Sequence, residues 1–135
     1  MLRISVDNLD KLFEAISGKQ TLYIPADRND GAAEYKKFKS GMKMSEKLNT
    51  LRSAKDFFFP QTENLVDFKM EGKKIEVIDN RKESEDFVVF GVRACDARSF
   101  TILDKVFLVD PVDSYYKNRR DFQDGLRKMN IQDLE

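Results

Sequence analysis

Apolar residues near the start of the chain recur with helical spacing. They stand at i, i+3, i+4 and i+7, at Leu9, Leu12, Phe13 and Ile16. Asp7 precedes them in a capping position and Gly18 follows them. The pattern predicts a helix with one buried stripe. Residues 3–6, with the sequence RISV, read as a short strand before it.

Alternating patterns predict two hairpins farther along. Residues 21–26 (TLYIPA) and 32–38 (AAEYKKF) form the first around a DRNDG turn, and Pro25 favours an edge or a strand exit over a central position. The second turns at Glu71-Gly72, with Ile75 and Val77 on one face. The apolar run 86–90 (DFVVF) predicts a central strand covered on both faces.

Further helices are predicted between and after these strands. The lysine-rich residues 40–56 read as a loosely packed helix or a mobile segment, and Thr62 can cap a short helix over 63–68. Asp96 can cap a longer helix that ends near Asp110-Pro111, and another helix begins at Asp113 or Ser114. The longer helix has four residues on its inner face, namely Phe100, Leu103, Val106 and Phe107.

These elements predict an α+β (mixed α/β) fold, with a small mixed β-sheet packed by helices. The chain has 135 residues, of which 41% are hydrophobic, so we expect residues 1–135 to form a single domain.

Charge and hydropathy exclude several classes of partner. Lys plus Arg and Asp plus Glu number 24 each, so no net field attracts the chain to nucleic acid or to an anionic membrane. No apolar run reaches the length of a membrane span, and acidic residues interrupt the start where a signal peptide needs an apolar core. We therefore expect a cytoplasmic protein with no nucleic-acid partner and no membrane insertion.

The inventory of reactive side chains is small. The chain has one cysteine and no histidine, which removes Ser-His and Cys-His catalysis and the commonest zinc, copper and iron ligand sets. It has neither a dinucleotide fingerprint nor a P-loop. We expect no catalytic activity from the isolated chain.

Cys95 lies in the segment FGVRACDARSF, between a predicted strand and a predicted helix. Three interpretations remain open. A helix amino terminus with Arg93 and Arg98 nearby would favour the thiolate, and this thiolate could be one ligand of a metal cluster. The same thiolate could be a redox-active nucleophile. Alternatively, Cys95 is a small buried residue that fills a tight turn, with Asp96 as a cap.

Two aromatic segments have both structural and binding interpretations. YYKNRR (115–120) could stack on a flavin, a nucleotide or nucleic acid, although a packed helix with arginines paired to acids such as Asp110 and Asp121 is the commoner arrangement. FFFP (57–60) is more typical of core than of a docking patch, although one phenylalanine could cover a neighbouring module.

Four segments together resemble a known family. They are LYIP, SAKDFFFPQTENLVDF, FGVRACDARSFTILDKVF and DSYYKNRR, and they extend from Leu22 to Arg120. Their order and spacing resemble the amino-terminal region of a family of iron-sulfur subunits found in anaerobic sulfite reductases and, as the beta subunit, in hydrogenases. In that family a Phe-Gly-x-Arg-Pro-Cys-Asp segment precedes a carboxyl-terminal ferredoxin-like region with two cysteine-rich 4Fe-4S motifs.

The resemblance implies an amino-terminal module of an electron-transfer subunit in an anaerobic oxidoreductase complex. Cys95 would supply one metal-ligating thiolate to a 4Fe-4S cluster in a full-length parent, and Arg93 and Arg98 would tune the cluster as cofactor-binding cations. Expected partners are the other redox subunits and the ferredoxin-like region.

The chain departs from the family pattern at two places. Ala94 stands where the family has proline, and the last residues, DFQDGLRKMNIQDLE, hold no further cysteine. One cysteine cannot hold a cluster that needs about four donors, so we expect none in this chain alone. The chain is then a fragment or a relative without the cluster-binding half. The alternative function is a cofactor-free module that docks partner redox subunits through FFFP and YYKNRR.

Overall fold

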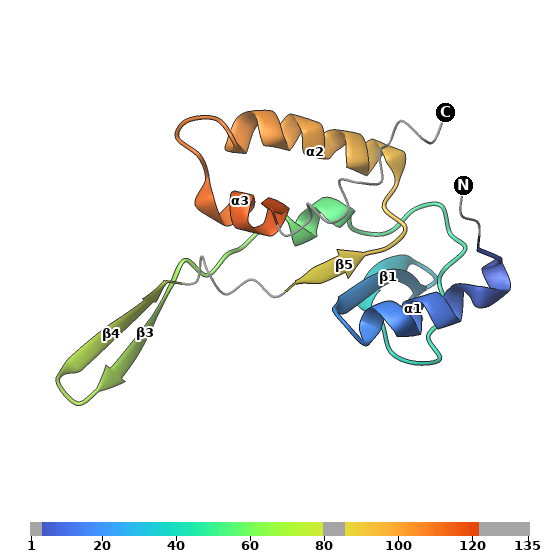
Figure 1. Cartoon of the computed structure of the whole chain (residues 1–135), viewed down its shortest axis with the longest axis horizontal. Coiled ribbons are helices and arrows are strands. Elements are labelled where there is room, and N and C mark those ends of the chain that lie inside the picture. The colour runs from blue at the N-terminus through green and yellow to red at the C-terminus, as the bar shows by residue number, and fades with distance from the viewer. Residues whose placement is uncertain (1–3, 80–85, 122–135) are drawn as a thin grey trace. The chain divides into compact units, whose positions relative to one another are not determined.

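The computed structural model describes residues 4–79 and 86–121. It contains three α-helices and two small sheets among these residues, so the predicted α+β class is confirmed (Figure 1). The chain divides into two compact units, one of residues 1–54 with 85–97 and one of residues 55–84 with 98–135. Each unit is described separately below, and the single domain over 1–135 stays a prediction.

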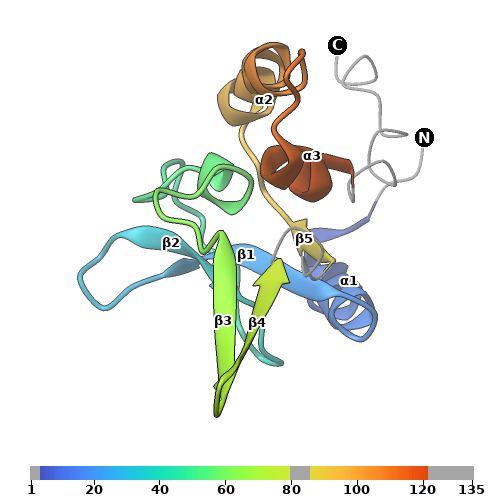
Figure 2. The same ribbon diagram turned by 90° about the vertical axis from the view of Figure 1, so that its left-hand side faces the viewer.

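The first unit is built on a mixed sheet. Helix α1 (Leu9–Ser17) precedes β1 (Thr21–Asp27) and β2 (Ala33–Lys37), and β5 (Phe87–Val89) joins them from later in the chain. The strand order is β2-β1-β5, with β1 antiparallel to β2 and parallel to β5 (Figure 2). Helix α1 packs on this sheet through a buried cluster formed by Phe13, Leu22, Ile24 and Phe38. The predicted helix and the first hairpin are thus confirmed.

Pro25 lies inside β1, the central strand of this sheet, so the prediction that it favours an edge or a strand exit over a central position was wrong. The carbonyl of Tyr23 accepts a hydrogen bond from Phe90, and that of Pro25 accepts one from Ser45, on the side of β1 away from β2. Strand β5 pairs only with residues 21–23. Proline is tolerated because its missing N–H falls beyond the end of the short neighbouring strand.

Two other predictions for this unit were wrong. Strand β5 lies at an edge of the sheet, because an apolar run does not reveal how many neighbours a strand has. Ile4 is not in a strand and Val6–Asn8 form a 3-10 helix, which leads directly into α1; residue 3 of the predicted strand lies outside the described residues. Asp7 is part of that 3-10 helix, and Asn8 occupies the N-cap position of α1.

The lysine-rich residues 40–56 were predicted to be a loosely packed helix or a mobile segment; residues 40–53 form no helix, and residues 54–56 lie in a 3-10 helix, Ala54–Phe57. Met42 and Met44 pack against the core cluster of the first unit, Ser45 is buried, and Thr50 makes an isolated bridge to Ala33. These contacts give residues 40–53 an irregular course, so the predicted α-helix was wrong there; the mobility of the segment stays a prediction.

The second unit combines a hairpin, a 3-10 helix and two α-helices. Strands β3 (Val66–Glu71) and β4 (Lys74–Asp79) are antiparallel, as predicted for the second hairpin. A 3-10 helix spans Ala54–Phe57 at the boundary between the units. Helix α2 (Ala94–Phe107) starts in the first unit and continues into the second, which also contains α3 (Ser114–Asp121).

Aromatic contacts form the core of this second unit. The ring of Phe58 lies 4.7 Å from that of Phe100, and the ring of Phe107 lies 4.8 Å from Phe59 and 5.2 Å from Tyr116. Phe58 is buried and Phe59 is half exposed, which agrees with the prediction that FFFP belongs mainly to the core.

Three local predictions for this unit were tested, and two need correction. The predicted helix over 63–68 is wrong, because Val66 begins β3 and the period-two alternation there outweighs the capping signal at Thr62. Helix α2 ends at Phe107, before the predicted Asp110, and Val106 is exposed. The cap of α3 is confirmed, since the Asp113 carboxylate accepts a hydrogen bond from the N–H of Tyr116 at 2.9 Å.

Candidate functional site

The segment that carries Cys95 is a tight connection between β5 and α2. Phe90 donates its N–H to Tyr23 at 2.8 Å and ends the strand pairing. Gly91 then adopts φ +76°, and a Cβ at this position would lie 3.2 Å from Pro25 Cγ. Both the positive φ and the close approach to Pro25 favour glycine. Helix α2 begins three residues later, at Ala94.

Asp96 is buried in the first turn of α2, with 5% of its surface exposed. Its carboxylate accepts hydrogen bonds from Ser53 Oγ at 2.7 Å and from Arg93 Nη2 at 3.3 Å. A carboxylate in a first helical turn is also favoured by the helix dipole. The helix starts two residues before Asp96, so the prediction that Asp96 is the N-cap was wrong; its side chain fixes the helix start from inside the first turn.

Arg93 links this turn to the irregular segment of the first unit. Its Nη1 donates to Asn49 Oδ1 at 2.5 Å, and its Nη2 donates to Asp96. Its Nε is buried and has no hydrogen-bond partner among the described residues. The guanidinium therefore acts as a bridge to a residue 44 positions earlier in the sequence.

Tyr35 reaches the same turn from β2. Its hydroxyl donates to the carbonyl of Gly91 at 3.0 Å. Burial raises the pKa of Tyr35, the charge of Asp96 raises it further, and the charge of Arg93 offsets part of this effect. The Tyr35 hydroxyl thus stays protonated at neutral pH and acts as a fixed donor to the turn.

Cys95 itself is exposed. This finding contradicts the interpretation that Cys95 fills the turn as a small buried residue. Arg98 is also exposed and follows Cys95 by three residues on α2, a spacing that places two side chains on neighbouring positions of one helix face. Within residues 4–79 and 86–121, no group of three or more histidine, cysteine, aspartate or glutamate side chains could hold a metal ion.

The site therefore has a buried polar part and an exposed thiol. The structure brings Arg93 and Asp96 together and adds Asn49, Ser53 and Tyr35, which the sequence did not indicate. The first two additions come from an irregular segment and the third from an ordinary strand, so no motif marks them. Chemically, the arrangement can present one soft sulfur donor on a helix start that is held rigidly by hydrogen bonds.

The YYKNRR segment (115–120) makes its contacts inside the second unit. Tyr116 is buried and donates its hydroxyl to Asp104 at 2.8 Å, and Arg120 binds the same carboxylate through two nitrogens at 2.9 and 3.0 Å. Arg119 pairs with Glu63. The predicted packing of YYKNRR is confirmed for these residues, but the acids are Asp104 and Glu63; the side chain of Asp121 lies outside the described residues.

These contacts change the ionisation of both partners of Asp104. Burial raises the pKa of Tyr116 above its usual range, and the hydrogen bond and charge of Asp104 act in the same direction. Burial would lower the pKa of Arg120, but the hydrogen bond and charge of Asp104 outweigh it and raise the pKa. Tyr116 and Arg120 are thus fixed structural groups.

No family model matches the chain, and no solved structure matches it. A search of curated proteins finds sulfhydrogenase 2 subunit beta from Pyrococcus furiosus, which is 37% identical over 71 residues. The match covers 53% of this chain and 20% of that relative, so the chain corresponds to about a fifth of its length. The match supports a distant relation to hydrogenase-type subunits.

None of the helices within the described ranges combines the length and the apolar character that crossing a membrane requires.

Proposed function

We propose that this chain is the amino-terminal module of an iron-sulfur electron-transfer subunit in an anaerobic oxidoreductase complex of the sulfite reductase or hydrogenase type. Cys95 contributes one thiolate to a 4Fe-4S cluster, and other redox subunits or a ferredoxin-like region of the same polypeptide supply the remaining ligands. Electrons pass through this module, and the chemistry on the substrate takes place elsewhere in the complex.

The observation that carries the proposal is the exposure of Cys95 at the start of α2. A thiolate that ligates a metal shared with another region must be accessible from outside its own core. The distant relation to a hydrogenase-type subunit supports the same assignment.

This chain can supply one thiolate ligand to a cluster and no more. A 4Fe-4S cluster takes about four thiolates, and the sequence has one cysteine. The described residues contain no alternative group of three or more ligating side chains. When bound, the cluster would accept and release single electrons. This chain's own part is to hold one sulfur in a fixed place.

Arg93 and Arg98 have different parts in this proposal. Arg93 is tied to Asp96 and Asn49, so it positions the helix start, and Asp96 compensates part of its charge. Arg98 is exposed, so its guanidinium can add positive charge beside a reduced cluster. Positive charge near a cluster raises its reduction potential.

The alternative function, a cofactor-free docking module, is less well supported. It relies on the YYKNRR surface, but Tyr116, Arg119 and Arg120 are engaged within the second unit. Only Phe59 of the FFFP segment has a large exposed fraction, 48%. A docking module also gives no reason for an exposed thiol.

The test is to express the reading frame that encodes this chain anaerobically, with any sequence that follows residue 135, and to quantify iron and acid-labile sulfide. The Cys95→Ala variant is expected to lose the iron of one cluster. Ala94→Ser, which changes the exposed neighbouring residue, serves as the matched control and should keep the iron. If no cysteine follows residue 135, or if Cys95→Ala keeps the full iron content, the ligand assignment fails.

A second measurement tests the role of Arg98. Arg98→Ala should lower the reduction potential of the cluster relative to Lys105→Ala, an equal loss of charge on an exposed residue about two turns farther along α2. Equal reduction potentials in the two variants would show that Arg98 does not tune the cluster. The role of Cys95 would then rest on the iron content alone.

A further inference from the structure

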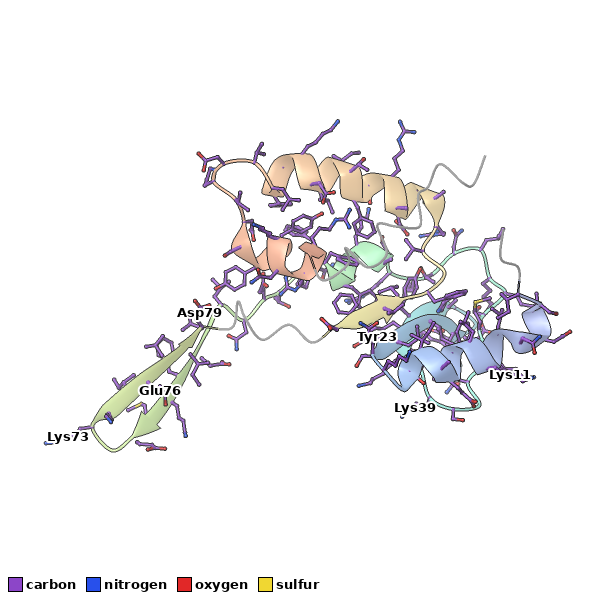
Figure 3. The ribbon with its side chains drawn as sticks, viewed as in Figure 1. Lys11, Tyr23, Lys39, Lys73, Glu76 and Asp79 are labelled. Carbon is purple, nitrogen blue, oxygen red and sulfur yellow. The ribbon has the colours of Figure 1, made fainter. Side chains whose placement is uncertain are left out.

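The hairpin formed by β3 and β4 has no strand partner on either side within the described residues. All six residues of β3 are exposed. Large apolar side chains gather on one face of the hairpin at high exposure, namely Val66, Phe68, Met70, Ile75 and Val77. Figure 3 shows side chains along both strands, with Lys73 at the turn and Glu76 and Asp79 on β4. An exposed strand edge of this kind is a site for strand addition.

The turn determines which backbone groups of β3 face outward. Glu71 pairs with Lys74 across the two-residue turn Gly72-Lys73, in which Gly72 has φ +62°. A β-turn closes with a hydrogen bond across its flanking pair, and bonded pairs then alternate along the ladder. Asp67, Lys69 and Glu71 therefore bond to β4, which leaves three residues with backbone N–H and C=O groups directed to the free edge, Val66, Phe68 and Met70.

The side chains of this edge are complementary to themselves. In an antiparallel pairing of two copies centred on Phe68, Phe68 meets the Phe68 of the second copy, and Val66 meets the second copy's Met70. Asp67 meets the second copy's Lys69, twice in each pair of copies. Opposite charges and apolar pairs directly across an antiparallel ladder are stabilising. This register also uses the outward backbone groups of Val66, Phe68 and Met70 as its bonded pairs.

The edge of β4 is less complementary to itself. Its outward residues alternate with those bonded to β3, so they are Ile75, Val77 and Asp79. Pairing two β4 edges with Ile75 opposite the second copy's Val77 would set Glu76 directly against the second copy's Glu76. Like charges in opposed positions are destabilising. A pairing centred on Ile75 would set Lys74 opposite the second copy's Glu76, but it would involve only residues 74–76 of each strand because residue 73 lies in the turn. The β3 edge combines matched charges with a bonded register over residues 66–70.

From these observations we propose that the β3 edge is a self-association site, at which two copies of this chain pair antiparallel about Phe68 and form a four-stranded sheet. A strand pair of this length buries less than the roughly 1,200 Å² of a stable interface, so the dimer is weak and depends on concentration. The proposal is independent of Cys95 and of any cluster.

The test uses the 135-residue chain with Cys95→Ser, so that the native thiol plays no part. Sedimentation velocity from about 10 µM to about 1 mM should show a monomer–dimer equilibrium. Asp67→Lys should weaken dimerisation about tenfold, because two attractive pairs become repulsive. Combining Asp67→Lys with Lys69→Asp and Glu76→Lys should restore it, since each introduced lysine at position 67 would again face a carboxylate of the second copy. The third change keeps opposite charges at positions 69 and 76, which pair across the hairpin.

The matched control is Asp110→Lys, which makes the same charge change at an exposed position of the same unit outside the hairpin and should leave the association constant unchanged. A monomer over the whole concentration range overturns the proposal. So does a dimer that Asp67→Lys leaves unaffected, or that the exchange of all three charges fails to restore while circular dichroism shows that the variants are folded.

Cross-linking tests the register independently of the charges. In the Cys95→Ser chain, Phe68→Cys should form a disulfide-linked dimer on mild oxidation, because paired Cα atoms in a bonded antiparallel pair lie about 5.5 Å apart. Val77→Cys, which lies opposite Phe68 on β4, should not, because three strand spacings of about 4.8 Å would separate its two copies. Equal cross-linking of both variants would contradict the proposed pairing.

Discussion

Two arginine–aspartate pairs in this molecule have similar chemistry and different surroundings. In the second unit, Arg120 binds Asp104 through two nitrogens, Tyr116 binds the same carboxylate, and the Arg120 guanidinium lies 5.4 Å from the centre of the Phe100 ring. In the first unit, Arg93 contacts Asp96 through one nitrogen at 3.3 Å, and its other bond goes to Asn49. The Arg120–Asp104 pair is enclosed by partners from its own unit and is called the closed pair below. The Arg93–Asp96 pair instead holds the turn that precedes α2.

The surroundings of each pair decide whether its charged residues have a structural explanation. The contacts of the Asp104 pair described above all stabilise its own unit, so the YYKNRR motif has a structural explanation. The Asp96 pair fixes the start of α2 and leaves the adjacent Cys95 exposed. A functional interpretation is needed only for the second case, because Arg93 and Asp96 hold a reactive group, the Cys95 thiol, that takes no part in their own contacts.

The largest effect is expected at the closed pair. Asp104→Ala should lower the free energy of unfolding by about 2–4 kcal/mol, because it leaves the largely buried Arg120 and the Tyr116 hydroxyl without their acceptor. Urea denaturation followed by circular dichroism measures this change. Asp110→Ala, at an exposed position in the same unit, should change it by less than about 0.5 kcal/mol. Equal effects would show that the Asp104 pair does not anchor this unit.

A smaller loss is expected at the turn. Asp96→Ala should cost about 1–3 kcal/mol, because the hydroxyl of Ser53 and the guanidinium of Arg93 lose an acceptor while Arg93 keeps one-third of its side-chain exposure and can be hydrated. Ser53→Ala removes one donor only and should cost about 1 kcal/mol. If Asp96→Ala were neutral, Asp96 would not hold the helix start.

Removing one hydroxyl gives a still smaller effect with a defined pH dependence. Tyr116→Phe should cost about 1 kcal/mol at neutral pH. The pKa of Tyr116 is raised above its usual value of 10.0, so the folded chain keeps this proton where the unfolded chain loses it. The free energy of unfolding therefore falls as pH rises above 10. Tyr116→Phe should reduce that fall and leave the part due to Tyr35, whose pKa is raised in the same direction; an unchanged alkaline slope would contradict this.

The smallest effect on stability is expected for the exposed cation beside Cys95. Arg98→Ala should change the free energy of unfolding by less than about 0.5 kcal/mol, since surface substitutions away from buried contacts are nearly neutral. The same denaturation experiment measures it. If Arg98→Ala lowered the free energy of unfolding as much as Asp96→Ala, Arg98 would belong to the contacts that hold the start of α2 and would not act only as an exposed charge.

The sequence predicted those parts of the fold that follow from local periodicity. Helix α1, both hairpins and α3 with its Asp113 cap follow from spacing and turn residues. The edge position of β5 and the central position of Pro25 depend on how strands from distant parts of the chain pair, and local patterns do not contain this information.

The candidate site was predicted only at its sequence-local residues. Arg93, Cys95 and Asp96 stand within one segment, whereas Asn49, Ser53 and Tyr35 reach it through the tertiary fold. The partner of Arg120 could not be assigned for the same reason, since Asp104 lies 16 residues away on another helix. Many oppositely charged residues along a sequence could pair with a given arginine, and the packing of the folded chain decides which one does.

In the proposed function, the start of α2 presents Cys95 outward as a ligand for a cluster that is completed elsewhere. The most direct measurement compares the alkylation rate of Cys95 by iodoacetamide in the isolated 135-residue chain with that in the iron-loaded product of anaerobic expression. Because the thiol is exposed in this chain, we expect rapid alkylation in the isolated chain, strong protection when iron is bound, and loss of that protection on iron removal. Equal alkylation rates in both preparations would contradict it.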